Sequence, residues 1–188
     1  MATRDILDFL SPEYEEYRNL SDKFYYDASC FMDIPIAPRY WDMFGGILFA
    51  YDFKWKSVKY MELDRYLKDD INRASKCGIY LFSVGPRVRI KGLPEYVFYV
   101  GIAGERDSNN PLRERLRNYI QKSGIEKRKK VHTVLALYHE DITIHYCEFD
   151  DTSELSKIEE YLHGFYLPWA NERDFPAFIK SAKKAFGH

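Results

Sequence analysis

The sequence predicts an α+β fold in which helices pack on a small mixed or antiparallel sheet. Hydrophobic residues make up 46% of the 188 residues, which is enough for the core of one domain. Two short apolar segments, 78–84 and 96–103, are typical of buried strands. Helix and strand patterns follow them, so the expected order from residue 78 is strand, strand, helix, strand, strand, helix.

The first two strands are expected to pair in antiparallel fashion. The chain that joins them contains Gly85, Pro86, Gly92 and Pro94, which favour turns and extended chain over helix. This connection also carries basic residues, so we interpret it as a lengthened hairpin.

Four further elements complete the expected core. An amphipathic pattern predicts a helix over 111–124, with Gly124 as its C-cap. Segments 131–139 and 141–150 are predicted to be two strands joined by a tight turn. The pattern over 153–167 predicts the final helix.

Residues 1–76 are predicted to be a mostly helical extension that packs on a core formed by residues 77–188. Helices are expected over 11–28 and 62–75, while the apolar run 46–53 fits either a strand or a helix. No linker composition separates the two parts, which favours a packing layer continuous with the core over a helical recognition arm or a dimerisation element.

Charge is distributed unevenly along the chain. The formal net charge is −1, but residues 86–130 hold 12 basic and 5 acidic side chains, a net charge of +7. The flanking segments 1–75 and 131–188 carry net charges of −4 and −5. A local basic region is typical of a polyanion partner, although a solvated helix face would give the same composition.

Composition also bounds the cellular context. No run of about 18 apolar residues is present, so we expect no transmembrane helix and no membrane partner. The N-terminal residues carry acids and lack an apolar core, unlike a secretory signal. The cysteines Cys30, Cys77 and Cys147 lack zinc-site spacing and indicate reduced thiols, so we expect a cytoplasmic protein.

Two tripeptides stand out on the two predicted strands. The first is Gly-Ile-Tyr at 78–80, and the second is Tyr-Val-Gly at 99–101. The next predicted helix carries Arg115 and, four residues later, Tyr119, so both side chains project from one helix face.

A third group of residues lies near the C-terminus. Glu159 is on the last predicted helix, with Pro168 nine residues and Asn171 twelve residues further on. These five elements, in this order over about residues 77–172, resemble the GIY-YIG nuclease superfamily, either a restriction-endonuclease-like or a stand-alone member.

The resemblance implies a fold and an activity. The expected fold is a small sheet flanked by helices, and the expected activity is hydrolysis of DNA phosphodiester bonds by a one-step attack of water. It implies that Tyr80 is the general base or holds the attacking water, and that Tyr99 positions water or phosphate. Arg115 would clamp the phosphate, with Tyr119 beside it in the site.

The resemblance also implies a metal and a bracing residue. Glu159 would hold Mg²⁺ (or Mn²⁺), and Asn171 would brace the end of the Glu159 helix or the wall of the cleft. The adjacent Glu160 is the alternative carboxylate, but the nine- and twelve-residue spacings start at Glu159.

The residue types suit this chemistry independently of any family. A carboxylate with waters is a usual way to hold Mg²⁺, and the guanidinium of Arg115 can donate two hydrogen bonds to one phosphate. Each residue alone also has a structural interpretation, because core tyrosines and surface glutamates are common.

The sequence departs from compact members of this superfamily at three points, one of which is a longer loop over 104–111 before the helix. Tyr80 and Tyr99 are 19 residues apart, which lengthens the connection between the strands. Ile102 follows the second tripeptide where some members have Lys or Ser, so no electrophilic role is expected there.

His163 leaves other interpretations open. It lies four residues after Glu159 and three after Glu160, so it could bind a metal ion together with one of these carboxylates on the same helix. It could instead be a proton donor near the cleft or a buried histidine beside Phe165.

DNA, duplex or branched, is the expected partner, and a duplex cut would favour a homodimer. The basic residues expected to track phosphates are Arg87, Arg89, Lys91, Arg113, Arg117, Lys127, Arg128, Lys129 and Lys130. Two alternatives remain at this point: a catalytically silent nucleic-acid-binding module, and a nuclease toxin controlled by a partner protein.

Overall fold

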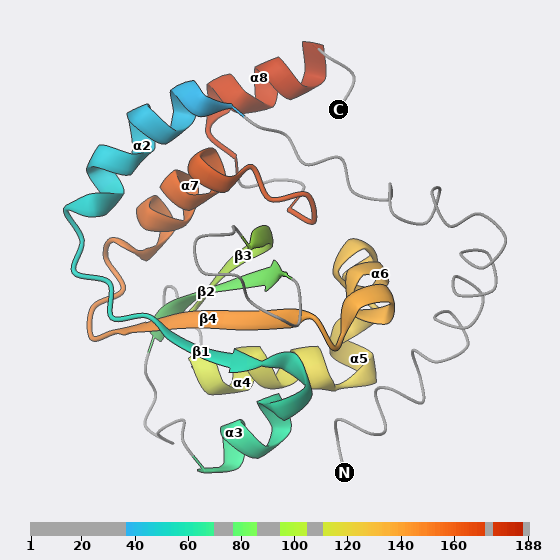
Figure 1. Cartoon of the computed structure of the whole chain (residues 1–188). Helices are drawn as coiled ribbons and strands as arrows, with labels where there is room; N and C mark the ends of the chain where they lie inside the picture. Colours follow the sequence, from blue (N-terminus) through green and yellow to red (C-terminus); the bar gives the residue numbers. More distant parts are fainter. Residues whose placement is uncertain (1–36, 70–76, 86–94, 105–110, 172–174, 186–188) are drawn as a thin grey trace, which may run out of the picture.

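A computed structural model describes residues 37–69, 77–85, 95–104, 111–171 and 175–185 of the chain. It confirms the α+β class, because a four-stranded antiparallel sheet lies between two layers of helices (Figure 1).

The sheet has the strand order β1-β4-β2-β3, and all neighbours are antiparallel. The central strands are β2 (Cys77–Val84) and β4 (Ile142–Phe149), and the edges are β1 (Lys56–Lys59) and β3 (Tyr96–Ala103). The predicted strands 78–84, 96–103 and 141–150 are therefore confirmed, and so is the antiparallel pairing of the first two.

One face of the sheet, which we call the tyrosine face, carries the larger core cluster. It is covered by helices α3 (Leu63–Asp69), α4 (Leu112–Arg117), α5 (Lys122–Ile125) and α6 (Lys129–Tyr138). Two short 3₁₀ turns, η2 (Tyr60–Glu62) and η3 (Asn118–Ile120), complete this layer.

The opposite face, which we call the aliphatic face, is covered by α7 (Leu155–Tyr166), with α2 (Pro38–Phe49) packed on α7 and α8 (Ala177–Ala185) lying next to α2 (Figure 1). Side chains alternate along a strand, so β2 supplies both layers. Tyr80 and Phe82 belong to the first cluster, whereas Ile79 and Leu81 belong to the second.

The prediction of a strand over 131–139 is wrong, because this segment lies in helix α6. Val131, Val134 and Leu135 are buried at helical spacing against the tyrosine face. A short apolar run rich in β-branched residues fits the periodicity of a helix as well as that of a strand, and packing against the sheet decides between the two.

The predicted helix 111–124 is interrupted. α4 and η3 end at Ile120, Gln121 is extended with φ −122° and ψ 130°, and the short helix α5 then begins. Gly124 therefore lies inside α5 rather than at a C-cap.

The segment before residue 77 contributes a strand that the pattern did not predict. β1 pairs with β4, and only Val58 of its four residues is buried, so its hydrophobic signal is weak. The run 46–53 divides between the end of α2 and an irregular stretch. The predicted helix 11–28 and the second half of 62–75 lie outside the described residues.

Helices long and apolar enough to cross a membrane are absent from the described part of the chain.

Candidate functional site

Tyr80 occupies the centre of the tyrosine face. Its side chain is completely buried, and its ring lies over Gly101 on the neighbouring strand. A Cβ atom at Gly101 would overlap the Tyr80 hydroxyl, so the two tripeptides of the sequence depend on each other sterically.

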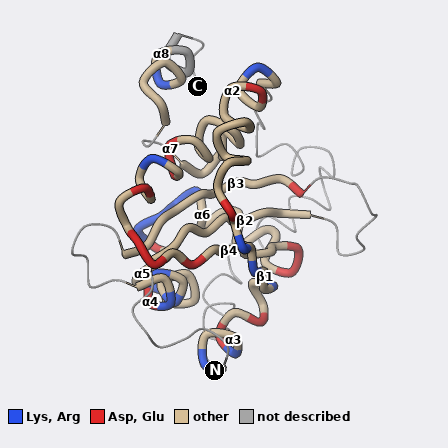
Figure 2. Tube along the Cα trace, turned by 90° about the vertical axis from the view of Figure 1, so that its left-hand side faces the viewer, with Lys and Arg blue, Asp and Glu red and all other residues tan. Residues whose placement is uncertain are grey.

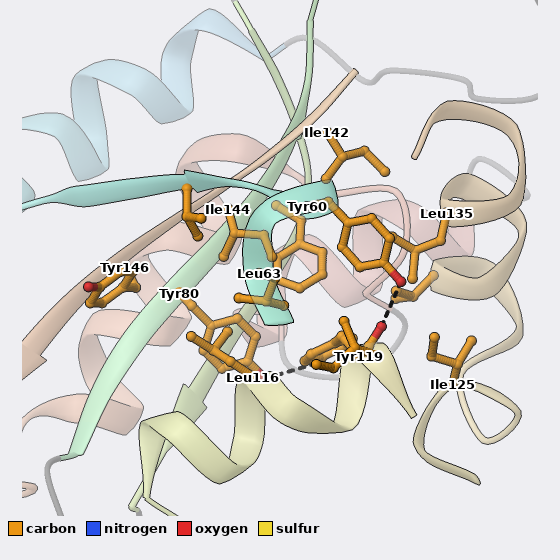
Figure 3. Close-up of a cluster of buried hydrophobic side chains, with 14 of the residues drawn as sticks. Tyr60, Leu63, Tyr80, Leu116, Tyr119, Ile125, Leu135, Ile142, Ile144 and Tyr146 are labelled. Carbon is orange, nitrogen blue, oxygen red and sulfur yellow. Dashed lines mark hydrogen bonds between the residues drawn. The ribbon is translucent and has the colours of Figure 1, made fainter. Parts of the chain in front are cut away.

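The hydroxyl of Tyr80 forms hydrogen bonds with two side chains from the next helix. Nε of Arg115 donates a hydrogen bond to Tyr80 Oη at 3.2 Å, and Tyr119 Oη lies 2.9 Å from the same oxygen. Figure 3 shows the Tyr80 and Tyr119 side chains directed toward each other between sheet and helix. The four-residue spacing on α4 and η3 thus brings Arg115 and Tyr119 to one atom, as their shared helix face predicts.

Tyr99 lies on the same face by the regular alternation of β3, since it is opposite Phe82 and two residues before Gly101, and a bulge just before it adds Phe98 to that face. The register between β2 and β3 shifts at Phe82 and Ser83, which leaves Phe98 as the extra residue of a β-bulge. Phe98 and Tyr99 both pack on the tyrosine face, and the Tyr99 ring centroid lies 6.2 Å from that of Tyr80. We call Tyr80, Tyr99, Arg115 and Tyr119 the tyrosine–arginine cluster.

Burial sets the protonation states in this cluster. Desolvation raises the pKa of Tyr80 above its ordinary value of 10, with the Tyr99 hydroxyl adding to the effect and Arg115 opposing it. Burial likewise raises the pKa of Tyr119 well above 10. The adjacent Tyr80 hydroxyl in turn raises the pKa of Arg115, which therefore stays charged. In this conformation both tyrosine hydroxyls are neutral and the arginine is a cation.

Asn171 binds the edge strand and does not enter the cluster. Its Oδ1 accepts a hydrogen bond from Val100 N at 2.9 Å, and its Nδ2 donates to Val100 O at 2.8 Å. Ala170 N also donates to Phe98 O at 2.8 Å. The buried amide therefore replaces a missing neighbouring strand and fixes the backbone beside Tyr99, rather than the end of the Glu159 helix.

The structure does not bring Glu159 into the hydrogen-bonded cluster. Glu159 is partly buried on α7, whose apolar residues pack on the aliphatic face, and it is not among the hydrogen-bond partners of Tyr80 or Arg115. α7 packs against α2 and, within the sheet, mainly against β3, the strand that carries Tyr99. The helix that carries Glu159 therefore contacts β3 on the face opposite the tyrosine face.

His163, the other candidate on α7, is completely buried with its ring centroid 5.5 Å from that of Phe175. The interpretation as a buried histidine fits this position, although the aromatic neighbour is Phe175 rather than Phe165. Groups of three or more His, Cys, Asp or Glu residues that could hold a metal do not occur among the residues that the structure describes.

Several of the basic residues expected on DNA are engaged with protein groups. Nε of Arg113 donates to the Leu67 carbonyl at 2.7 Å, and Arg117 pairs with Glu114 at 2.7 Å. Lys130 lies over the Trp169 ring.

Arg128 is close to the cluster. Its guanidinium donates to the Gly124 carbonyl at 2.6 Å and lies over the Tyr119 ring, 5.1 Å from the centroid.

The remaining basic residues divide into two groups. Lys127 and Lys129 are exposed, and Figure 2 shows basic residues along α4 and α5 near them in the chain. The predicted contacts Arg87, Arg89 and Lys91 lie outside the described residues.

A second polar cluster lies on the aliphatic side of the sheet. Nε2 of His145 is 2.9 Å from Ser83 Oγ and 3.1 Å from Glu95 Oε2, and Ser83 Oγ donates to that same carboxylate at 2.6 Å. A hydrolytic triad needs serine and acid on different ring nitrogens, so this arrangement does not form one.

Tyr60 is a buried contact of the cluster that sequence patterns did not single out. Its hydroxyl donates to the Tyr119 carbonyl at 2.8 Å, across 59 residues of chain (Figure 3). No local spacing connects the two positions, so only the tertiary fold reveals the link.

No family model, curated protein or solved structure matches this chain.

Proposed function

We propose that the protein is a metal-dependent DNA endonuclease that hydrolyses phosphodiester bonds by a one-step attack of water. The proposal rests on one observation. Two sequence elements far apart in the chain meet at the Tyr80 hydroxyl oxygen, because β2 supplies Tyr80 and the helix α4–η3 brings the Arg115 guanidinium and the Tyr119 hydroxyl to it.

Arg115 suits the role of phosphate ligand. Its Nε donates to Tyr80, and a guanidinium has further N–H groups on its two Nη atoms that can bind two oxygens of a phosphate. A charged group held by a buried hydroxyl is oriented before the substrate arrives, which favours stabilisation of charge in the transition state.

Tyr80 is the residue that we assign to the attacking water, either to orient it or to activate it. In the reaction a water oxygen bonds to phosphorus and the bond from phosphorus to the leaving oxygen breaks, while the water gives up a proton to solvent and the leaving oxygen takes one up. The raised pKa of Tyr80 favours a neutral hydroxyl that orients the water by hydrogen bonding. The alternative role as general base requires that a bound cation lower this pKa.

Glu159 is the residue that would hold Mg²⁺ or Mn²⁺. Its carboxylate is a hard oxygen ligand, and Mg²⁺ is usually held by one or two carboxylates with waters, so a single protein ligand fits the ion. The metal would supply a cationic charge near the phosphate.

Cleavage of supercoiled plasmid tests the proposal. We expect nicked or linear product with Mg²⁺, none with EDTA, and a loss of roughly 100- to 1,000-fold for both Arg115→Ala and Glu159→Gln. Glu160→Gln is the matched control, because it removes a neighbouring exposed carboxylate and should leave the rate unchanged.

Two results would replace the proposal. If the protein binds duplex DNA, branched DNA or RNA but cleaves none of them with either metal, it is a silent nucleic-acid-binding module. If cleavage appears only after removal of a co-purifying protein, it is a nuclease toxin held inactive by that partner.

A further inference from the structure

Tyr60 connects the segment before the first tripeptide to the candidate site. It lies in η2, between β1 and α3, and its side chain is completely buried in the cluster on the tyrosine face. Its hydroxyl donates to the main-chain carbonyl of Tyr119 at 2.8 Å.

The Tyr119 carbonyl lies where the helix stops. η3 ends at Ile120, and the extended conformation of Gln121 interrupts the helical hydrogen-bond pattern. The last carbonyls of a helix lack donors from the following turn, and a buried one needs a partner from elsewhere. Tyr60 supplies that donor, and it thereby fixes the backbone of the residue whose own hydroxyl contacts Tyr80.

A second bond joins the same two segments. Nε of Arg113, at the start of α4, donates to the carbonyl of Leu67 in α3 at 2.7 Å. The stretch Arg113–Tyr119, which includes Arg115, is therefore held near both ends by the segment 60–67. This segment is attached to the sheet by β1, on the edge opposite β3.

From this geometry we propose that Tyr60 is a positioning residue of the nuclease site. It holds Tyr119, and through Tyr119 it holds the Tyr80 hydroxyl at the distance that lets Arg115 bind it. The inference rests on the proposed nuclease function. The new point is that a working site would need Tyr60, which lies outside residues 77–172, the part of the chain that resembles the superfamily.

The inference predicts a specific kinetic effect. The Tyr60 hydroxyl binds the Tyr119 carbonyl and not the Tyr80–Arg115 pair, so Tyr60→Phe should leave the affinity for DNA unchanged. Loss of the hydroxyl frees the Tyr119 backbone and misplaces the Tyr80–Arg115 pair, and small misplacements of reacting groups lower the catalytic rate strongly. We expect kcat to fall roughly tenfold with KM unchanged.

Tyr66→Phe is the matched control. Tyr66 is on the same segment, and its hydroxyl lies 3.0 Å from the Tyr146 hydroxyl rather than on Tyr119. Both variants remove one hydroxyl from a buried or half-buried tyrosine, so both should lower the unfolding temperature, but only Tyr60→Phe should lower kcat. Equal kcat values for the two variants in the full-length protein would overturn the inference.

A spectroscopic measurement separates this inference from the proposed function. Buried, hydrogen-bonded tyrosine hydroxyl protons exchange slowly enough to be followed by NMR. Tyr60→Phe should shift the hydroxyl signals assigned by Tyr80→Phe and Tyr119→Phe, and Tyr66→Phe should shift them less. If these shifts occur but neither wild type nor variants cleave nucleic acid, the proposed function fails while the positioning contact stands; if the signals do not move, the positioning role fails.

Discussion

The two faces of the sheet are built from the same strands but differ in chemistry. The tyrosine face contains three tyrosines and an arginine in ring or hydrogen-bond contact, whereas the aliphatic face at the same strands is formed by residues such as Ile79, Leu81 and Val100. Alternation along β2 allows one strand to anchor the fold on one side and present the candidate site on the other. The difference teaches that both faces should support stability, whereas side chains on the tyrosine face should matter for activity as well.

The largest expected effects come from truncating one buried aliphatic residue on each face. Leu116→Ala and Ile179→Ala each truncate a buried side chain, the second on α8 and away from the candidate site, and each should lower the free energy of unfolding by about 2–5 kcal/mol. Leu116 adjoins Arg115, so we expect only Leu116→Ala to reduce DNA cleavage at a temperature where both variants are folded. Denaturant unfolding and plasmid assays check this, and equal cleavage by the two variants would erase the distinction between the faces.

Adding a methyl group to one glycine on each face gives the next effect. Gly101→Ala would overlap the Tyr80 hydroxyl, and Gly164→Ala would overlap the Phe44 ring on the aliphatic side. Overpacking of this kind should cost each variant about 1–3 kcal/mol of unfolding free energy. We expect cleavage to fall at least tenfold for Gly101→Ala alone, measured against the similarly destabilised Gly164→Ala.

A smaller effect is expected at the edge of β3. Asn171→Ala leaves the Val100 amide and carbonyl without their side-chain partner and should cost about 1–3 kcal/mol of unfolding free energy. Asn171→Asp should cost more, because a carboxylate oxygen would then face the Val100 carbonyl without a proton to donate. Amide hydrogen exchange at Val100 measures the loosening directly, and a ranking with Asp milder than Ala would contradict the assigned amide orientation.

The smallest effect is a dependence on alkaline pH. The pKa values of Tyr80 and Tyr119 are raised by burial above the unfolded value of 10, so the folded state holds these protons more tightly. Their contribution to stability is complete below pH about 10 and is lost as the pH rises toward the folded-state values. Urea midpoints between pH 8 and pH 11 should be flat and then fall, and the fall should be smaller in Tyr119→Phe.

Much of the tyrosine face could be predicted from the sequence. Strong apolar runs predicted β2 and β3, and the spacing of Arg115 and Tyr119 predicted a shared helix face that both side chains use. Segment 131–139 was mispredicted because its apolar residues fit a strand and a helix equally, and only contact with the sheet selects the helix.

The long-range parts of the site could not be predicted. Tyr60 lies 59 residues from Tyr119, and no local pattern records such a contact. The bulge that places Phe98 beside Tyr99 on the tyrosine face could not be predicted either, because it depends on how β3 pairs with β2 and not on the sequence of β3 alone. The role of Glu159 remains a prediction of spacing, because its helix packs on the other face.

The side-chain amide of Asn171 has a consequence for the behaviour of the protein in a crowded solution. An open sheet has two edges whose unpaired backbone groups can recruit strands from other molecules and start aggregation. At β3 the edge is partly closed by Ala170 and Asn171, and at β1 it is only four residues long with a lysine at each end. A change that frees the β3 edge should therefore appear first as loss of solubility during heating, before any loss of secondary structure.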